Sequence, residues 1–332
     1  MYPLLSIQNL SVDFVSESGN VTALNKISFS INSSEIVAIV GESGSGKSVT
    51  ALAILQLLPT PPAKYLSGQI LFSETGTEQT NLLKSGTRSL RDIRGNKIAM
   101  IFQEPMTSLN PVLTCGTQVM ETLQTHNKIS NSAAKQKTLK WFERTKLPDP
   151  DFVFNSYPHQ LSGGQKQRVM IAMAMCCHPS LLICDEPTTA LDVTIQKTIL
   201  HLIKELQQQS GMGVIFISHD LGVVRHIADE VMVMYLGRSV EHGPKEAIFA
   251  GPRHPYTRAL LASTPVVNPK ERLTRAPLRG ELPSPLNPPP GCAFHRRCPF
   301  ATALCAESRP ELREVDGRMV ACHHAESVAA AA

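Results

Sequence analysis

The stretch Gly41-Glu42-Ser43-Gly44-Ser45-Gly46-Lys47-Ser48 decides how this chain folds. It fits the phosphate-binding pattern G-x-x-x-x-G-K-[ST]. The apolar run Ile36–Val40 before it predicts a buried parallel strand. The run Val49–Leu58 after it predicts a helix that ends at Pro59. Strand, glycine loop and helix start are the context that this pattern requires, so the sequence predicts an α/β core with an anion site at the loop.

The chemistry of the loop follows from its residue types. Backbone N–H groups of the loop and the positive end of the next helix face one point, where an anion is stabilised. The glycines permit backbone angles that a Cβ would forbid. Lys47 can reach the β- and γ-phosphates, and the Ser48 hydroxyl can ligate Mg²⁺. A chance Gly/Ser turn is the alternative interpretation. The predicted nucleotide-binding residues of the loop are Gly41, Ser43, Gly44, Ser45, Gly46, Lys47, Ser48 and Val49.

Length and composition are those of an ordinary folded protein. The 332 residues suffice for two domains; 42% are apolar and 18% charged, and the net charge is +4. This charge gives no strong electrostatic case for nucleic acid as a partner. No stretch approaches 18 consecutive apolar residues, which predicts no membrane span. Residues 1–14 lack the basic and apolar regions of a secretory signal. We expect a cytosolic protein, which can still sit on a membrane protein.

The N-terminal part of the chain predicts an antiparallel hairpin. Apolar and polar residues alternate over 4–15 and 21–31, around Ser18-Gly19-Asn20. Phe14, at the end of the first of these strands, is a candidate to stack on a nucleotide base, although a core aromatic is an equally good interpretation. Gly68–Phe72 predicts another strand, and the polar residues 73–95 predict a surface excursion.

Two carboxylates follow the apolar strand pattern Leu181–Cys184. The carboxyl ends of parallel strands are where open α/β sheets place ligand contacts. We assign Asp185 to Mg²⁺, which it can hold through water, and Glu186 to the nucleophilic water, which it can polarise. A plain strand-to-loop exit is the structural alternative for such a pair.

Two further strand ends carry polar residues. The strand pattern Ile98–Phe102 ends at Gln103, which could sense both Mg²⁺ and the attacking water. The pattern Val214–Ser218 ends at His219, which could hydrogen-bond a γ-phosphate oxygen. Considered alone, a glutamine or a histidine at the end of a strand more often has a structural role than a role in binding or catalysis. Residues 230–241 predict one more strand pair, and residues 244–250 close this core.

A second glycine-containing helix start lies at Leu161-Ser162-Gly163-Gly164-Gln165. The run Lys166–Cys177 after it predicts a helix, whose free N–H groups and dipole point outward. Ser162 suits the cap position. A simple capped helix is the alternative. Residues 112–160 before it read as helical, with Trp141 and Phe142 as packing anchors and a break at Pro148 and Pro150. Asp192 stands near the start of another helix, 193–209.

Together these motifs resemble those of the ATP-binding cassette ATPases, in that family's order and spacing. The match covers residues 4 to about 250. It implies a head-to-tail dimer with two ATP molecules between the subunits. Ser162 and Gly164 would contact the γ-phosphate bound by the partner's loop, and Gln103 would couple hydrolysis to a transmembrane partner. The residues that carry the resemblance are Gly41–Ser48, Gln103, Leu161–Gln165, Leu181–Glu186, Ala190–Asp192 and His219.

A narrower resemblance is to the ATPases of dipeptide, oligopeptide and nickel importers, of which this chain is similar to the first, D-type, subunit. It implies a heterodimer with a second, paralogous ATPase, two permeases and an extracytoplasmic solute-binding protein, and no nucleic acid. The subunit would lie peripherally on the cytoplasmic face of the inner membrane and drive uptake of di- or oligopeptides. Nickel chelates and opines remain alternative solutes. The resemblance rests on Phe102–Pro111, Tyr157–Gln160, Arg253–Thr257 and the cysteine-containing tail.

The tail 251–332 differs in composition from the predicted ATPase domain 1–250, whose helical subdomain we place at about 104–178. Half of the chain's 24 prolines follow residue 250. Such a segment has little regular structure of its own and needs a cross-link, such as a disulfide or a bound metal, to be stable. In a reducing compartment, clustered cysteines suggest a metal or an iron–sulfur site more than disulfides. The tail cysteines, with spacing C-x5-C-x6-C-x16-C, are Cys292, Cys298, Cys305 and Cys322.

This spacing fits neither short zinc knuckles nor the ferredoxin patterns. The resemblance to dipeptide-importer ATPases implies a [4Fe–4S] cluster on the four cysteines, structural or redox-sensing and not catalytic. Zinc, with His295, His323 or His324, and unligated thiols remain alternatives. The other cysteines, which lie in or beside apolar runs, are expected to pack as small hydrophobes. They are Cys115, Cys176, Cys177 and Cys184.

Two functions of other classes fit parts of the sequence. A soluble cassette protein in translation or DNA repair would usually carry two cassettes or a long coiled-coil insert, and this chain has one cassette and neither insert. An iron–sulfur assembly or redox-regulatory ATPase is suggested only by the tail cysteines. Co-purification with membrane permeases separates the importer from both.

Overall fold

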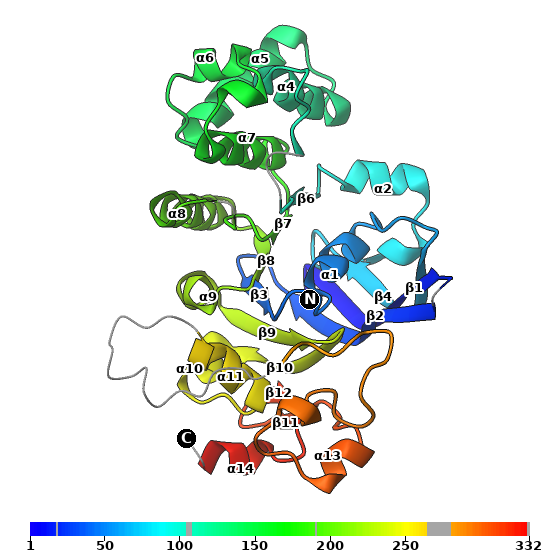
Figure 1. Cartoon of the computed structure of the whole chain (residues 1–332). Helices are drawn as coiled ribbons and strands as arrows, with labels where there is room; N and C mark the ends of the chain where they lie inside the picture. The colour runs from blue at the N-terminus through cyan, green and yellow to red at the C-terminus, as the bar shows by residue number, and fades with distance from the viewer. Residues whose placement is uncertain (18, 104–107, 190, 264–279, 331–332) are drawn as a thin grey trace. The chain divides into compact units, whose positions relative to one another are not determined.

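The computed structural model describes residues 1–17, 19–103, 108–189, 191–263 and 280–330, with only the backbone of residues 329 and 330. Residues 104–107 and Ala190, which belong to the motifs quoted above, lie outside this set. The chain divides into two compact units. Figure 1 labels the helices and strands of both. Unit 1 comprises Met1–Leu4, Ile31–Glu35 and Phe72–Ile215. Unit 2 comprises Leu5–Ser30, Ile36–Leu71 and Phe216–Ala332.

Unit 2 contains the predicted N-terminal hairpin, which is confirmed. Its strands β1 (Leu5–Ser16) and β2 (Gly19–Ile31) lie in one sheet with β4 (Ala63–Phe72), in the order β2-β1-β4. β4 begins at Ala63 and not at the predicted Gly68. Because its first half is largely exposed, no hydrophobic pattern marks it, and pairing with β1 keeps it extended.

A second sheet of unit 2 holds the strand before the phosphate loop. This strand, β3 (Ile36–Val40), is fully buried, as predicted, and runs parallel to β9 (Glu230–Tyr235). β9 pairs antiparallel with β10 (Arg238–Pro244), which confirms the strand pair expected over 230–241. The helices α9 (Leu221–Ile227) and α10 (Lys245–Ala250) also belong to this unit.

The tail is more regular than its composition predicts. β12 (Arg318–Val320) pairs antiparallel with β10, and β11 (Arg313–Val315) pairs with β12. The expectation of little regular structure was therefore wrong, because β10 supplies backbone partners that a proline-rich segment cannot supply locally. Short helices complete the tail: α11 (Pro255–Ser263), η3 (His295–Arg297), α13 (Ala303–Glu307) and α14 (Ala325–Ala330).

Unit 1 contains two parallel strands and a group of helices. β6 (Ile98–Ile101) pairs with β7 (Leu181–Asp185), and β8 (Gly213–Ser218) is the strand in which the chain passes to unit 2. Trp141 and Phe142 are buried, which confirms them as packing anchors. The helices are α4 (Cys115–His126), α5 (Asn131–Arg144), α6 (Pro150–Asn155), α7 (Gly163–Met175) and α8 (Val193–Ser210).

Residues 73–95 are not simply a surface excursion. They form β5 (Thr80–Asn81), a 3-10 turn and α2 (Thr87–Ile93), and they bury Leu82 and Leu90. The sequence-based expectation missed these elements because each is too short for a periodic pattern.

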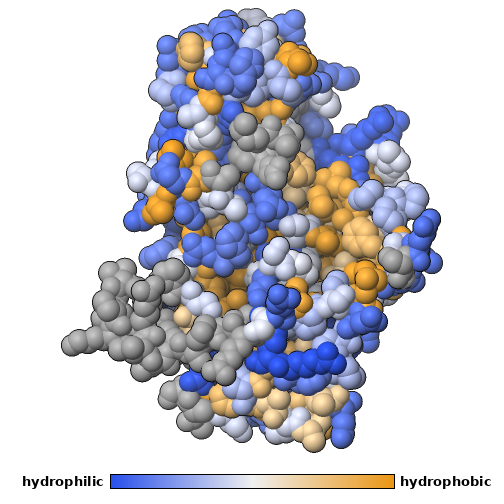
Figure 2. All heavy atoms as spheres, viewed as in Figure 1, coloured by the Kyte–Doolittle hydropathy of each residue, from blue (hydrophilic) through white to orange (hydrophobic). Residues whose placement is uncertain are grey.

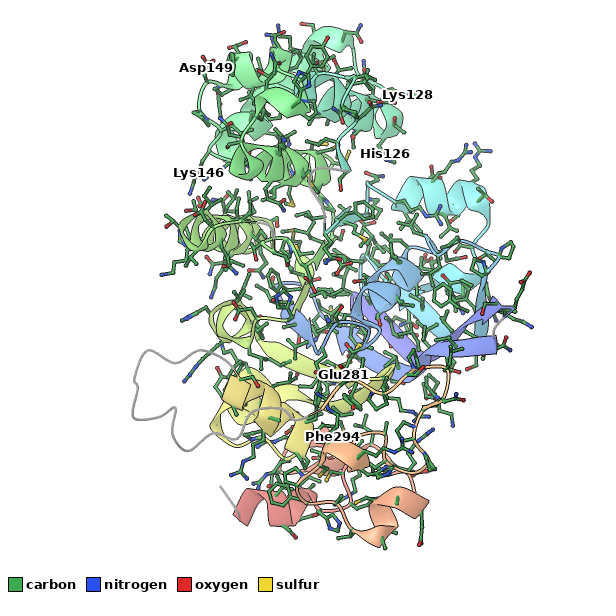
Figure 3. All side chains as sticks on the ribbon, viewed as in Figure 1. His126, Lys128, Lys146, Asp149, Glu281 and Phe294 are labelled. Atoms are coloured by element: carbon green, nitrogen blue, oxygen red, sulfur yellow. The ribbon has the colours of Figure 1, made fainter. Side chains whose placement is uncertain are left out.

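None of the helices in the described ranges is both long and apolar enough to cross a membrane. The α4–α7 region, at the top of Figure 2, presents mainly hydrophilic side chains on the face shown, with scattered hydrophobic ones. Lys128, Lys146 and Asp149 extend outward from this region (Figure 3).

Candidate functional site

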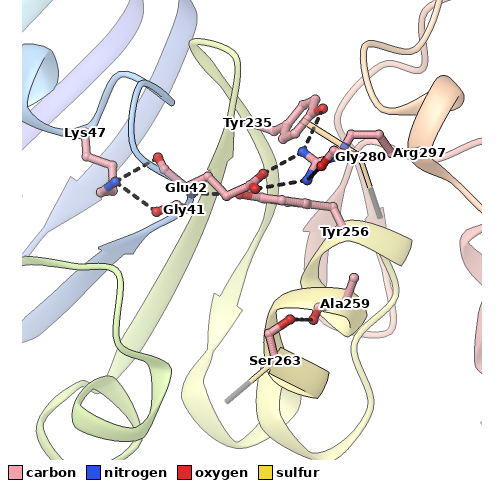
Figure 4. Close-up of polar contacts among 9 residues, drawn as sticks. All are labelled: Gly41, Glu42, Lys47, Tyr235, Tyr256, Ala259, Ser263, Gly280 and Arg297. Atoms are coloured by element: carbon pink, nitrogen blue, oxygen red, sulfur yellow. Dashed lines mark hydrogen bonds and ion pairs between the residues drawn. The ribbon is translucent and has the colours of Figure 1, made fainter. Parts of the chain in front are cut away.

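The phosphate loop spans the turn between β3 and α1 (Lys47–Ile54). Lys47 is buried at 5% exposure, and its Nζ donates hydrogen bonds to the carbonyl oxygens of Gly41 at 2.9 Å and Glu42 at 3.0 Å (Figure 4). An ammonium group held inside a ring of backbone atoms is placed to meet phosphate oxygens. The structure thus confirms the predicted strand–loop–helix context of this lysine.

Glycine is required at two positions of the loop. Gly46, which caps α1, has φ of 101°, and a Cβ there would lie 2.8 Å from the carbonyl oxygen of Ala23. A Cβ on Gly41 would clash with the carbonyl oxygen of Met234. These contacts keep the loop close to the neighbouring backbone, so the N–H groups at the start of α1 form a narrow concavity.

The helix after the loop differs from its prediction at both ends. α1 begins at Lys47 and ends at Ile54, whereas the sequence predicts Val49–Leu58. Gln56 adopts a left-handed conformation with φ of 49°, which an α-helix cannot contain, so the helix stops before Pro59 has any effect.

The remaining predicted loop residues differ in accessibility. Ser43 and Gly44 are exposed, Ser48 and Val49 are half-buried, and Ser45 is buried. The Ser45 hydroxyl makes no hydrogen bond within the described residues. Phe14 is half-buried in β1, so base stacking stays a prediction for it.

The two carboxylates of unit 1 differ in their surroundings. Asp185 ends β7 and is 4% exposed. Glu186 follows outside the strand with φ of 46°, a left-handed conformation that is uncommon for a residue with a side chain. Its Oε2 accepts a hydrogen bond from Thr189 Oγ1 at 2.8 Å. Thr189 was not predicted from the sequence, because a single threonine after the carboxylates carries no pattern.

The structure brings Gln103 and Glu186 together. β6 and β7 pair in parallel with Ile101 beside Cys184, so the residues that follow the two strands emerge side by side. Gln103 Nε2 donates to Glu186 Oε2 at 3.4 Å, a long hydrogen bond. Hydrogen bonds from Thr189 and Gln103 orient this carboxylate, as a base toward water requires.

The motif at residues 161–165 forms the start of a helix. Ser162 caps α7: its hydroxyl accepts from the N–H of Gln165 at 3.3 Å, and Gln165 Oε1 accepts from the N–H of Ser162 at 2.9 Å. The cap prediction is confirmed, but the helix runs over Gly163–Met175 and not 166–177. The two glycines therefore lie in its first turn, where backbone N–H groups have no partner within the helix.

Gly164 is required by packing. A Cβ there would lie 2.9 Å from Cγ2 of Ile195 on α8. The cap of α8 is Asp192, whose Oδ1 accepts from the N–H groups of Thr194 and Ile195 at 3.1 and 2.9 Å. The capped start of α8 thereby supports the glycine turn of α7.

His219 directly follows β8 and is exposed. Its neighbour Asp220 caps α9 through the N–H of Gly222 at 2.8 Å. The predicted residues thus fall into two groups. The phosphate loop, Phe14 and His219 belong to unit 2; Gln103, Asp185, Glu186 and residues 161–165 belong to unit 1.

The four tail cysteines line one small cavity together with His295, His323 and His324. All four are free cysteines. Burial, and then the neighbouring thiols, raise the pKa of Cys298 to about 12 and that of Cys322 to about 11. Within the described ranges no three His, Cys, Asp or Glu side chains are close enough to hold a metal ion. Of the other cysteines, Cys115, Cys176 and Cys184 are buried, as expected of small hydrophobes, and Cys177 is half-buried.

Two family models match the sequence. The model described as "ABC transporter" matches residues 24–189. The model described as "Oligopeptide/dipeptide transporter, C-terminal region" matches residues 240–305. The second match includes the turn with Cys292 and Cys298, so the tail is similar to a region found in transport proteins.

Curated relatives match almost the whole chain. A probable peptide ABC transporter ATP-binding protein of Sinorhizobium fredii is 47% identical over 98% of this chain and 96% of its own length. The dipeptide transport ATP-binding protein DppD of Haemophilus influenzae is 46% identical, with 96% of this chain and 95% of that protein covered. The oligopeptide transport ATP-binding protein OppD of Bacillus subtilis is also 46% identical, over 94% of this chain and 86% of that protein.

Solved structures match the cassette part of the chain. One is the dimeric, post-hydrolysis state of an ATP-binding cassette bound to ADP and Pi. It is 27% identical, with a TM-score of 0.64, and covers 73% of this chain and 98% of the solved chain. The predicted α/β nucleotide-binding fold is confirmed by this match.

Proposed function

The chain belongs to the ATP-binding proteins of ABC transporters, in the dipeptide and oligopeptide group, and from this premise we propose how its residues work. It is the ATP-binding subunit of a peptide importer, which couples ATP hydrolysis to uptake. The observation that carries this conclusion is the identity of 46% to a dipeptide transport ATP-binding protein over 96% of this chain, tail included. The transport names of the relatives favour this function over translation, DNA repair and iron–sulfur assembly.

ATP would be held by the phosphate loop. Lys47 is already placed among the loop carbonyls, and the N–H groups at the start of α1 point to the same concavity. We assign the triphosphate to Gly41 and Ser43–Val49, Mg²⁺ to Ser48 and Asp185, and base stacking to Phe14. In such sites catalysis comes mostly from positioning and from charge stabilisation.

Hydrolysis would use Glu186 as the residue that polarises the attacking water. Hydrogen bonds from Thr189 and Gln103 orient the carboxylate for this role. Gln103 would report hydrolysis to the transmembrane partner, and His219 would bind the γ-phosphate. Ser162 and Gly164 would contact the ATP bound by the partner ATPase, through N–H groups in the first turn of α7.

The proposed assembly contains a second, paralogous ATPase, two permeases and an extracytoplasmic solute-binding protein. The dimeric cassette with ADP and Pi supports a pair of ATPase subunits. In this assembly the subunit would lie peripherally on the cytoplasmic face of the inner membrane. The division into an ATPase domain 1–250, with a helical subdomain at about 104–178, and an extension 251–332 is part of the same proposal.

An uptake experiment tests the function. A strain that lacks the gene is expected to lose import of a labelled dipeptide and to regain it with the wild-type gene, and the tagged protein is expected to co-purify with two permeases. The control is a labelled free amino acid, whose uptake should not change. If a nickel chelate or an opine depends on the gene and dipeptides do not, the peptide assignment is wrong. If the strain without the gene keeps normal uptake of all these solutes, the importer function itself is contradicted.

A [4Fe–4S] cluster on the tail cysteines is the proposed further cofactor. Four thiols face one cavity, which fits the four cysteine ligands of such a cluster. A single zinc ion on the same thiols is the competing assignment, and metal analysis separates the two. When bound, the cluster would staple the tail and could supply a redox-sensitive centre; the residues that would hold it are Cys292, Cys298, Cys305 and Cys322.

Anaerobic purification tests the cluster. The full chain is expected to carry about four iron and four sulfide per protein, with a visible absorbance that is lost on chelation. Replacing Cys298 by Ser should abolish this absorbance, whereas the matched control Cys177→Ser, outside the tail, should retain it. Zinc in place of iron in the anaerobic protein, or no metal at all, would contradict the cluster.

A further inference from the structure

The C-terminal extension contacts the phosphate loop directly within unit 2. The Arg297 guanidinium forms a two-point ion pair with the Glu42 carboxylate, Nη1 to Oε2 at 2.7 Å and Nη2 to Oε1 at 3.0 Å (Figure 4). The arginine side chain is 5% exposed and the glutamate side chain 27%. Paired geometry and burial distinguish this ion pair from an exposed one, which contributes little.

Arg297 is itself held in place. It donates to the Tyr235 hydroxyl at 3.3 Å and to the carbonyl oxygen of Gly280 at 3.1 Å. Its guanidinium also lies 5.9 Å from the ring centroids of Tyr235 and Phe294. Burial by itself would lower the pKa of Arg297, but its hydrogen bonds with Glu42 and Tyr235 raise that pKa overall. The guanidinium is therefore a fixed positive charge beside the loop.

The main chain of Glu42 is also held by a residue from the C-terminal part of the chain. Its N–H donates to the hydroxyl of Tyr256 at 2.8 Å. The Tyr256 ring packs against Tyr235 at 4.7 Å and against Phe294 at 5.4 Å between centroids. Phe294 lies in the extension below the sheet in Figure 3. Both the backbone and the side chain of Glu42 are thus held by residues that follow β8.

The turn that carries Arg297 also carries two of the tail cysteines. The N–H of Arg297 donates to the Phe294 carbonyl at 2.9 Å, and the N–H of Cys298 to that of His295 at 3.3 Å. At the other end of the turn, the N–H of Cys292 donates to the Cys305 carbonyl at 2.8 Å. The four-cysteine cavity therefore borders the turn from which Arg297 reaches the loop.

Glu42 presents an electrostatic difficulty for a triphosphate site. It places a carboxylate in a loop that binds anions, one residue from Gly41, whose carbonyl contacts Lys47. Like charges repel across several ångströms, and more strongly where water is partly excluded. We propose that Arg297 is a positioning residue of the ATP site, which cancels the charge of Glu42 and fixes the loop from the C-terminal extension. The inference rests on the proposed ATP binding at this loop.

Equilibrium binding of ATP and ADP to the full chain tests this role. In Arg297→Gln the Kd for ATP is expected to rise about tenfold, because the Glu42 charge is no longer cancelled. The double variant Glu42→Gln/Arg297→Gln should return to within about threefold of wild type, since neither charge remains. ADP, with less negative charge, should respond less than ATP. At about 1 M salt, where screening acts within roughly 3 Å, the difference should shrink.

The matched control is Arg296→Ala, the exposed neighbour on the same turn, whose ATP affinity should equal that of wild type. If Arg297→Gln binds ATP as Arg296→Ala does, the inference fails. It also fails if the double variant stays as weak as the single one, because a merely structural role would give that result. Should Arg297→Gln not fold, Glu42→Gln, which removes the carboxylate and leaves the arginine charge beside the loop, must bind ATP at least as tightly as wild type. Failure of the wild-type chain to bind ATP would instead overturn the proposed function.

Discussion

Replacing Glu186 by Gln is expected to reduce the ATPase rate of the assembled importer by about 10²- to 10⁴-fold, the usual range for loss of a catalytic base. Glutamine keeps the shape of the side chain, and its amide oxygen can still accept from Thr189 and Gln103, as the carboxylate does at 2.8 and 3.4 Å. It cannot take a proton from water. The variant should therefore still bind ATP and remain in the closed, ATP-bound dimer, measured by steady-state phosphate release and by retention of labelled ATP.

Thr189→Ala provides the control for this prediction. It removes one hydrogen bond to the carboxylate but leaves the base, so the rate should fall by about tenfold or less, in line with the free energy of one hydrogen bond. ATP should not be trapped. Turnover of Glu186→Gln at the wild-type rate would show that another group activates the water.

The motifs could be predicted because each is local in sequence. A β-branched run before the glycine loop, an apolar run before Asp185 and a serine cap before a helix are patterns within ten or so residues, and their contexts are confirmed. The sequence placed Gln103 and Glu186 each at a strand end but did not predict their contact, which depends on β6 and β7 being parallel neighbours in the sheet.

Contacts that depend on distant pairing could not be predicted. Arg297 and Glu42 are 255 residues apart, and a single arginine in a proline-rich tail carries no periodic signal. The same holds for β12, a three-residue strand that exists because β10 offers it a partner. The end of α1 depends on the left-handed conformation of Gln56, which helix propensity does not reveal.

Replacing Lys47 by Ala is expected to abolish peptide uptake and to weaken ATP binding by roughly 10²-fold, because a charge-assisted contact to phosphate contributes about 1.5–3 kcal/mol. The lysine is 5% exposed and bonded to the carbonyls of Gly41 and Glu42, so alanine removes the cation and leaves two carbonyl oxygens without this donor. ATP affinity is measured on the purified chain, and uptake of a labelled dipeptide on cells that carry the variant.

Lys64→Ala is the matched control, since Lys64 is an exposed lysine of β4 in the same unit and should leave both readouts unchanged. A melting temperature close to that of wild type would separate loss of ligand binding from loss of fold. Because Lys47 also bonds the loop carbonyls, a decrease of a few degrees is compatible with the assignment. Normal ATP affinity together with normal uptake would contradict the assignment, because the loop would then bind phosphate without the charge on which its role depends.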